Sequence, residues 1–217
     1  MAAMTQTQPE TAPGRLRFPE DEARLPWLSI LLEALHVTDQ GVAEAIRRET
    51  AQGRRLACRK GCANCCRTHV DIPVYPLELM GIAWYVAEKL QDPDRERIRE
   101  RLRTAEALDA CPFLIDERCG IHPLRPQACR LFNVFDTPCA VGEDAWHTRR
   151  RDVLTPLPRY RDQATEIMLP FYGVRGRKAV RQALREGAIH RLAGSLRECR
   201  WEALVERMEH EDARRRS

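Results

Sequence analysis

Aromatic residues and long apolar runs are scarce in this sequence. Only thirteen of the 217 residues are Phe, Trp or Tyr, so we expect a core of aliphatic side chains that is carried mostly by helices. No stretch of 18 apolar residues occurs, which argues against a membrane-spanning helix. Residues 1–20 lack the basic and then apolar order of a secretory signal. The sequence therefore predicts a protein of the reducing cytoplasm that does not bind a membrane.

Motifs for nucleotides and nucleic acids are also lacking. The nearest glycine-rich segment, Gly173-Val-Arg-Gly176, is too short for a phosphate-binding loop and follows no predicted strand. Two basic runs occur, at residues 149–151 and 213–217. Such runs are usually solvated, and no aromatic platform for stacking on bases accompanies them. Nucleic acid is therefore not favoured as a partner, whereas a protein partner is left open.

The remaining pattern predicts a mainly α protein. We expect a single domain of packed helices over residues 21–210, arranged around an irregular cysteine-rich metal-binding region at residues 55–140. Residues 1–20 are polar and contain prolines, which predicts a disordered tail, and residues 211–217 predict a basic tail. No internal repeat or domain-length linker is present.

Apolar residues at helical spacing, together with prolines and capping residues, place the helices. The first pattern, residues 21–35, contains Pro26, so its helix is expected to start there, where a proline is tolerated. Cys199 falls in the apolar stripe of the last helix and is predicted as a core residue. Residues 69–72 alternate and predict an extended segment. The other predicted helices are 40–52, 76–91, 93–108, 126–132, a helix after Pro158 that is broken near 170–173, and 188–207.

Cysteine is the abundant and informative residue. Eight of the nine cysteines lie between positions 58 and 139, and four of them fall within nine residues, where their thiolates can converge on a soft metal. In a reducing compartment such thiols indicate metal or redox chemistry, and an odd total fits a disulfide framework poorly. The glycine at position 61 permits a left-handed turn inside the dense run. The metal-ligand candidates are Cys58, Cys62, Cys65, Cys66, Cys111, Cys119, Cys129 and Cys139.

Neighbouring residues add detail to this interpretation. Adjacent side chains diverge, so Cys65 and Cys66 are expected to serve two metals, or one metal and a structural role. Arg125 and Arg130 are candidate hydrogen-bond donors to ligating sulfur atoms, and cations of this kind lower thiol pKa values. Eight thiolates with two divalent ions would bring the formal net charge from +4 to zero.

Histidines near the cysteines are weaker candidates. His69 follows Cys66 by three residues, and His122 follows Cys119 by three. Either imidazole could replace a thiolate as a metal ligand. A packed or exposed histidine is the simpler interpretation of both.

The order and spacing of these residues resemble the YkgJ-type cysteine-cluster family over about residues 55–135. That family is described as a zinc- or iron-chelating domain, and flagellin lysine N-methylases contain a related domain. The resemblance implies that all the candidates except Cys139 are metal ligands. Two departures are the x3 spacing between Cys58 and Cys62 and the histidine at 122, where the family usually has an aromatic residue. The matching segments are Cys58-x3-Cys62-Ala-Asn-Cys65-Cys66, Pro76-x-Glu78, Cys111-Pro-Phe-Leu, Cys119-Gly-Ile-His122 and Arg125-Pro126-x2-Cys129-Arg130.

The sequence leaves the cofactor and the function open between alternatives. Four thiolates can hold zinc in a closed site, or they can hold an iron–sulfur cluster. The first function hypothesis is a non-catalytic metal-binding protein. The alternative, by analogy with the methylases, is a cluster-dependent enzyme for methyl or redox transfer. S-adenosylmethionine is one candidate cosubstrate for such an enzyme, because Cys58-x3-Cys62-x2-Cys65 has the spacing found in radical enzymes that use it.

Overall fold

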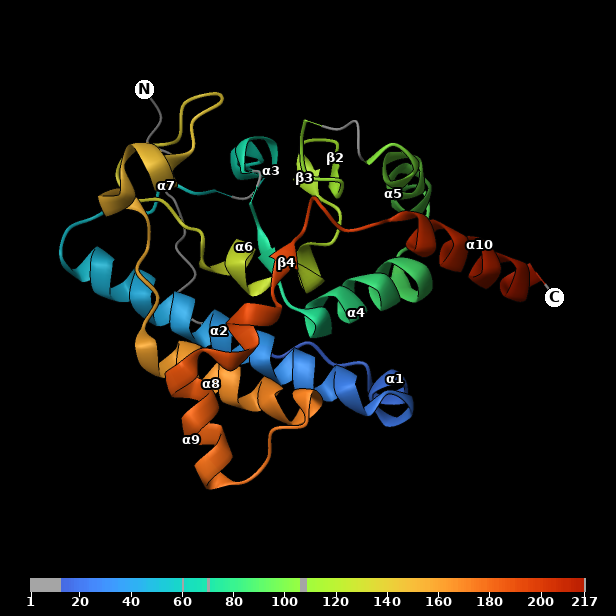
Figure 1. Cartoon of the computed structure of the whole chain (residues 1–217). Helices are drawn as coiled ribbons and strands as arrows, with labels where there is room; N and C mark the ends of the chain where they lie inside the picture. The colour runs from blue at the N-terminus through green and yellow to red at the C-terminus, as the bar shows by residue number, and fades with distance from the viewer. Residues whose placement is uncertain (1–12, 60, 70, 106–108, 217) are drawn as a thin grey trace.

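The computed structural model of the chain describes residues 13–59, 61–69, 71–105 and 109–216. These residues are mainly helical with short two-residue strands, which confirms the predicted fold class. In Figure 1 the long helix α2 (Pro26–Ala51) and helix α8 (Pro158–Met168) lie side by side. The segments that carry the clustered cysteines lie on one side of this pair.

Prolines start the first two helices. Helix α1 (Pro19–Arg24) and α2 both have proline at the first helical position, where the missing N–H removes no helical hydrogen bond. The predicted start of α2 at Pro26 is confirmed. The predicted division into two helices is wrong, because α2 is continuous. Thr38 lies inside this helix, and its hydroxyl donates to the Ala34 carbonyl (2.9 Å) one turn back.

Gly41 lies in the middle of α2 because α8 crosses the helix there. A Cβ atom at position 41 would lie 2.6 Å from the Cβ of Tyr160 on α8, much closer than the 3.5–4.0 Å at which carbon atoms pack. The missing side chain therefore allows the two helices to touch. α8 continues into the 3₁₀ turn η5 (Leu169–Tyr172), so the predicted break near residue 170 is confirmed.

A buried arginine joins the elements at the other end of the molecule. Helix α4 (Pro76–Trp84) runs into the π-helical turn η1 (Tyr85–Lys89), followed by α5 (Asp94–Arg103), and α10 (Glu202–Arg216) packs against both η1 and α5. Arg95 of α5 is only 3% exposed. Its guanidinium donates to the carbonyls of Val86 (2.6 Å), Ala87 (2.7 Å) and Met208 (3.0 Å), and it pairs with Asp212 (2.7 Å). One side chain thus supplies partners for carbonyls on two helical elements.

The predicted helix over residues 188–207 is wrong. After α9 (Arg177–Glu186) come the 3₁₀ turn η6 (Ala188–Leu192) and strand β4 (Gly194–Ser195), and α10 starts only at Glu202. β4 pairs antiparallel with β1 (Pro73–Val74), and the Leu196 N–H donates to the Ile72 carbonyl (2.8 Å). Ile189 and Leu196 belong to different hydrophobic clusters, so their helical spacing in the sequence reflects no shared helix face.

The cysteine-rich region is irregular, as predicted, and its helix near Pro126 is present. Short elements alternate with loops, and the strand pair β2–β3 is antiparallel. The elements are α3 (Asn64–Thr68), β2 (Leu114–Ile115), β3 (Arg118–Cys119), η3 (His122–Leu124), α6 (Gln127–Leu131), α7 (Ala145–Thr148) and η4 (Arg150–Asp152).

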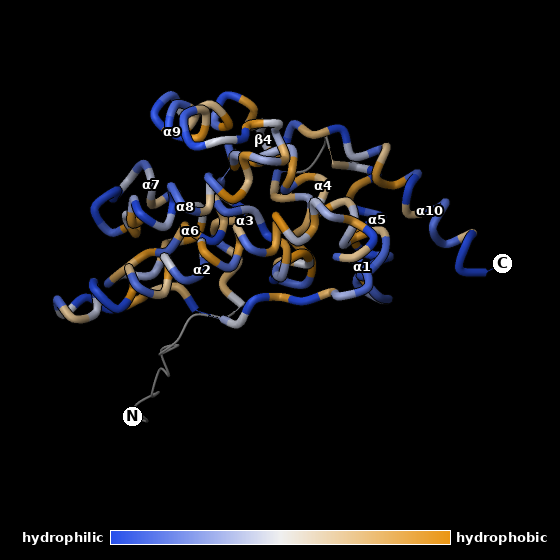
Figure 2. The backbone as a smooth tube through the Cα atoms, turned by 90° about the horizontal axis from the view of Figure 1, so that it is seen from below, coloured by the Kyte–Doolittle hydropathy of each residue, from blue (hydrophilic) through white to orange (hydrophobic). Residues whose placement is uncertain are grey.

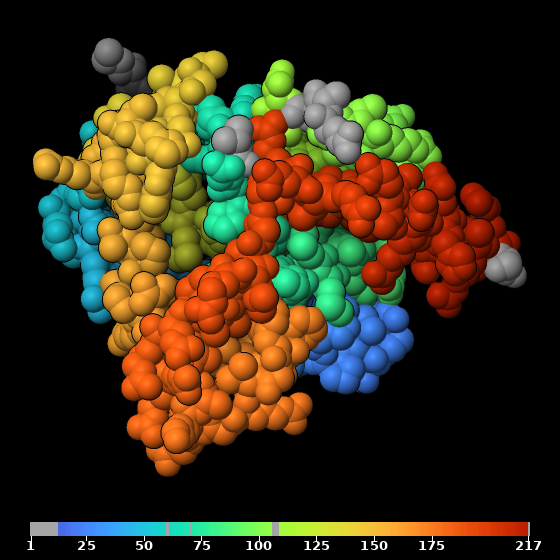
Figure 3. Space-filling view, in the orientation of Figure 1, coloured from blue at the N-terminus to red at the C-terminus, as the bar shows by residue number. Residues whose placement is uncertain are grey.

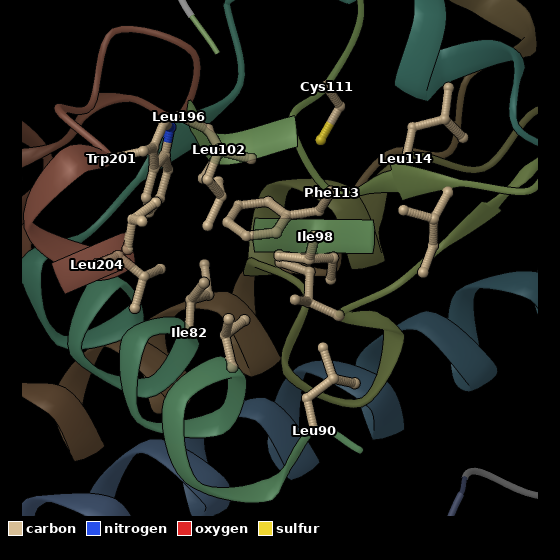
Figure 4. Packing of buried hydrophobic residues seen from close by; sticks show 14 of the residues in the cluster. Ile82, Leu90, Ile98, Leu102, Cys111, Phe113, Leu114, Leu196, Trp201 and Leu204 are labelled. Atoms are coloured by element: carbon tan, nitrogen blue, oxygen red, sulfur yellow. The ribbon is translucent and has the colours of Figure 1, made fainter. Parts of the chain in front are cut away.

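Two hydrophobic clusters lie on opposite faces of α4. Ile82 faces the first cluster, shown in Figure 4, which includes Phe113 and Trp201 with ring centroids 5.0 Å apart. Trp84 faces the second cluster, formed mainly with α2, α8 and α9. Figure 2 shows apolar residues concentrated inside the assembly of helices and hydrophilic residues at the far end of α10. In the described ranges, no helix has both the length and the apolar character needed to cross a bilayer.

Both predicted tails need correction where they are described. Residues 1–12 of the expected disordered tail lie outside the described residues, but Arg15 pairs with Glu22 (2.7 Å) and with Glu33 of α2 (3.0 Å). Residues 13–20 are therefore bound to the helical body. The expected basic tail is the last turn of α10, where Arg215 donates to the Glu88 carbonyl (2.7 Å). Ser217 lies outside the described residues, and Figure 3 shows α10 extending from the body of the molecule.

The position of Arg95 gives a stability prediction. Arg95→Ala should lower the free energy of unfolding by about 3 kcal/mol, because three buried carbonyls lose their donor and Asp212 loses a partner. The measurement is urea unfolding of metal-matched samples. Arg103→Ala is the control: Arg103 pairs with Glu209 (2.8 Å) with both side chains about half exposed, so we expect a loss of about 0–1 kcal/mol. Similar losses for both variants would contradict this account of Arg95.

Candidate metal centre

Backbone hydrogen bonds bring the two groups of cysteines together. The Cys111 N–H donates to the Cys66 carbonyl (2.7 Å), and the Ala57 N–H donates to the Val134 carbonyl (2.8 Å). The dense cysteine run is therefore joined to both later segments. Gly61 has φ = +79°, which is the left-handed turn that the sequence predicted for it. All nine cysteines are free thiols.

Cys111 and Cys119 are two candidate ligands that each have a backbone N–H group acting on the sulfur atom. Cys111 is 5% exposed and lies at the edge of the cluster in Figure 4. Burial raises the pKa of Cys111 to about 12, against a lowering by the Phe113 backbone N–H, which donates to the thiol. Burial also raises the pKa of Cys119, and the Ile121 N–H acts on it in the same opposing way. Backbone donors of this kind stabilise the thiolate form that metals bind.

Cys129 and Cys65 lie close to these two thiols. Burial raises the pKa of Cys129, and the charges of Cys111, Cys119 and Cys65 raise it further. The pKa of Cys65 is raised first by its hydrogen bond with the Cys66 side chain and then by burial. Several thiolates cannot ionise together in such an apolar place unless a cation compensates them.

Arg125 supplies part of that positive charge. It lowers the pKa of Cys65, Cys119 and Cys129, in each case against a larger raising by burial or by a hydrogen bond between thiols. Its Nε atom is buried and has no hydrogen-bond partner in the structure. A buried guanidinium donor without an acceptor is costly, and a thiolate cluster next to it would provide one. The role of Arg125 as a donor to ligating sulfur stays a prediction.

A second group of thiols lies nearer the surface. Cys58 accepts a hydrogen bond from the Val134 N–H (N–Sγ 3.2 Å), and burial raises its pKa to about 11. Cys62 is exposed, and Cys139 is partly buried beside Cys58. Burial raises the pKa of Cys139, and the charge of Arg149 lowers it. Figure 3 shows residues 136–152 in yellow close to the teal segment that carries Cys62.

The histidines and Cys199 occupy different surroundings. The His69 ring packs edge-on against Phe132 (centroids 4.1 Å apart), and its Nε2 lies 3.5 Å from Asp144. Burial lowers the pKa of His69, so this histidine tends to be neutral. His122 is exposed. Cys199 packs against the first hydrophobic cluster, as predicted, and its thiol donates to the Ser195 carbonyl (3.4 Å).

Arg130 forms its hydrogen bonds with oxygen atoms. It pairs with Asp39 of α2 (2.6 Å) and donates to the carbonyls of Arg125 (3.0 Å) and Pro123 (2.5 Å). These hydrogen bonds of Arg130 go to oxygen atoms and not to sulfur, which was its predicted role. Its charge still lowers the pKa of Cys119, against the larger effect of burial. Arg130 chiefly fixes the loop before α6 to α2.

Two residues near the site have roles that the sequence did not predict. Arg101 donates to the carbonyls of Cys111 (3.1 Å) and Pro112 (3.3 Å), although it belongs to an Arg/Glu run that predicts a solvated helix face. The buried Glu78 carboxylate accepts from the N–H groups of Tyr75 (2.9 Å) and Gln127 (2.8 Å). Glu78 thus joins the start of α4 to the start of α6, the helix of Cys129. Its place in the Pro76-x-Glu78 motif was the one available signal.

The donor set fits a soft metal, although the sulfur atoms are not gathered around one point. Among the described residues, no three His, Cys, Asp or Glu side chains are placed to share one ion. Rotation of the cysteine side chains would be needed to close such a site. Free thiols, backbone N–H donors to sulfur and the unpartnered Arg125 Nε all suit bound thiolates. The hollow of about 300 Å³ next to β1 and β4 is lined by Asp71, Pro73, Gly194 and Ser195, and so by no cysteine.

Free thiols drawn from two stretches of chain are typical of a cysteine-type metal-chelating domain. Residues 57–151 match the family model CxxCxxCC, which is described as a "Putative zinc- or iron-chelating domain". The resemblance inferred from the motifs is thereby confirmed for this segment, which contains all eight clustered cysteines. No curated protein and no solved structure matched the chain.

The buried Glu78 gives a prediction on pH. Burial raises the pKa of Glu78 from its ordinary 4.5 to about 7, against a lowering by its two backbone donors. The folded state therefore binds this proton more tightly than the unfolded state, and the stability that this gives is present below pH 4.5 and lost as pH rises through 7. Wild-type stability should fall by up to about 3 kcal/mol over this window relative to Glu78→Gln.

Urea unfolding at pH 5.0, 6.0 and 7.5 measures this difference. Glu22→Gln is the control, because Arg15 lowers the pKa of Glu22 to about 2, so stability from Glu22 is lost only below pH 4.5. Parallel stability curves for wild type and Glu78→Gln would contradict the prediction.

Proposed function

We infer that this chain is a metal-binding protein that holds zinc or an iron–sulfur cluster through the thiolates of its clustered cysteines. The observation that carries this proposal is the meeting of two cysteine groups, joined by the hydrogen bond from the Cys111 N–H to the Cys66 carbonyl (2.7 Å). Eight free thiols from the two cysteine groups fall inside the segment that matches the chelating domain.

The protein's own groups would prepare thiolates for the metal. The N–H groups of Phe113, Ile121 and Val134 act on the thiols of Cys111, Cys119 and Cys58. Such hydrogen bonds stabilise bound thiolates and orient them. Bound zinc would close the irregular region as a structural centre, whereas an iron–sulfur cluster would add electron transfer.

The metal is identified by elemental analysis and an optical spectrum of protein purified without oxygen. Iron and sulfide with broad visible absorption indicate an iron–sulfur cluster, and colourless protein with zinc indicates thiolate-bound zinc. Wild-type protein without stoichiometric metal, even after reconstitution, would overturn the proposal.

Substitution of single cysteines tests the proposed ligands. Cys111→Ser should lower the amount of bound metal and reduce stability, because metal binding contributes to folding. Cys199→Ser is the matched control, since Cys199 packs against the same hydrophobic cluster. It should retain the wild-type metal content. Equal metal content in the two variants would sink the assignment of Cys111.

Arg125 can be tested separately from the ligands. Arg125→Gln should weaken metal binding by about 10–100-fold, because the bound thiolates would lose a buried cation and donor. Competition with a chromogenic chelator measures the affinity. The control is Arg159→Gln, since Arg159 is exposed and contacts Tyr160 (2.9 Å) on α8. If both variants bind as wild type does, Arg125 has no part in holding the metal.

A further inference from the structure

Helix α9 carries a row of cations on its exposed face, here called the α9 stripe, which consists of Arg177, Lys178, Arg181 and Arg185. Positions 177, 181 and 185 repeat every four residues, so they follow one face of the helix at intervals of about 6 Å. Lys178 lies beside them, three residues before Arg181. Arg175, two residues before the helix, is exposed as well.

The α9 stripe lacks acidic partners of its own. Within the part of the chain that the structure describes, none of its four side chains forms an ion pair with a carboxylate. The one acidic residue of α9, Glu186, accepts instead from the Gln182 amide (2.8 Å). Helix α5, which is also rich in arginine, differs in this respect, because its Arg95, Arg97 and Arg99 each pair with a carboxylate.

The positive charge of the chain is concentrated around this helix. Residues 173–191 contain six Lys or Arg residues and one acidic residue, which gives this segment a formal charge of +5. The net charge of the whole chain is +4, so the remaining residues are slightly acidic in balance. Like charges four residues apart repel one another and destabilise a helix. A negatively charged partner would relieve this repulsion.

The apolar face of α9 argues against a membrane as that partner. Val180, Ala183 and Leu184 pack in the second hydrophobic cluster and are used by the protein itself. A helix that lies on a bilayer needs this face for contact with the acyl chains. Leu192 in the neighbouring turn η6 is half exposed, and a single leucine is a small anchor.

The short length of the α9 stripe argues against a long polyanion. From Arg177 to Arg185 the helix rises about 12 Å. Duplex nucleic acid carries one charge per about 1.7 Å along its whole length, so it would extend over the slightly acidic remainder of the molecule. A partner helix with carboxylates at every fourth residue has the same repeat of about 6 Å as the arginines. Such a helix can pair with all three arginines at once.

We propose that the α9 stripe is a docking surface for an acidic helix of a partner protein. Carboxylates at positions i, i+4 and i+8 of that helix would lie opposite Arg177, Arg181 and Arg185. Figures 1 and 3 show α9 at the bottom of the molecule, away from α3 and the β2–β3 pair of the cysteine-rich region. Docking there leaves those segments uncovered, and the inference does not depend on the proposed metal.

The test is fluorescence anisotropy of a labelled, alanine-based helical peptide with glutamate at every fourth residue, titrated with the full-length protein at low ionic strength. Wild type should bind this peptide, more weakly as salt is added, and should not bind the same peptide with glutamine in place of glutamate. Arg177→Gln/Arg181→Gln should weaken binding by about 10-fold, because two exposed ion pairs are lost.

The matched control is Arg47→Gln/Arg48→Gln, which removes the same charge from the exposed end of α2. Arg47 and Arg48 pair with Glu44 (2.6 Å and 2.9 Å), so this variant should bind the peptide as wild type does. Both double variants should fold, since the replaced side chains are exposed, and circular dichroism checks this.

Several outcomes would overturn the inference. One is wild type that does not bind the acidic peptide, and another is equal weakening by the two double variants, which would show a general effect of charge. Duplex DNA and vesicles containing phosphatidylglycerol are the competing probes. Tighter binding of either one, lost in Arg177→Gln/Arg181→Gln, would assign the α9 stripe to that anion instead. Self-association of wild type, lost in the same variant, would assign it to a second copy of the chain.

Discussion

The structure depends on how several ionisable sulfur atoms can share a small apolar volume. Burial shields Cys111, Cys119 and Cys129 from water, and the charges of Cys111 and Cys119 act on Cys129. Without compensation, such groups stay neutral. The chain places backbone N–H donors and Arg125, whose Nε atom is buried, near them, which favours the ionised form. The irregular backbone of residues 110–150 follows from the need to aim these donors, because a regular helix or sheet would use the same N–H groups itself.

A buried polar network connects this region to the helical body. Glu78 bridges α4 and α6, the Gln127 side chain accepts from Thr38 of α2 (3.2 Å), and Arg130 pairs with Asp39 of α2. All three contacts converge on the short helix that carries Cys129. A five-residue helix has little stability of its own, so these contacts from α2 and α4 determine where it lies. The long helices thus serve as the frame that fixes one candidate ligand.

The sequence predicted best those features that depend on local chemistry. Prolines marked the starts of α2 and α4, and the cysteine spacing marked the segment that matches the chelating domain. The features it missed depend on distant partners. The contact of Gly41 with Tyr160 depends on α8, and strand β4 exists because residues 73–74 lie beside it. Arg101 shares the pattern of a solvated helix face, and only the folded chain shows that it reaches the Cys111 carbonyl. The assignment of individual ligands remains a prediction.

The contact between Gly41 and Tyr160 has a consequence for the tolerance of this fold to change. At position 41 the gap between α2 and α8 leaves no room for a Cβ atom. Even alanine there would push the two helices apart. Thr38, Gly41, Gln127 and Tyr160 border one narrow hollow. A side chain at position 41 would therefore also disturb Gln127, the first residue of α6, two residues before Cys129. The absence of a side chain at position 41 thus allows α2, α8 and the helix of Cys129 to pack together as they do.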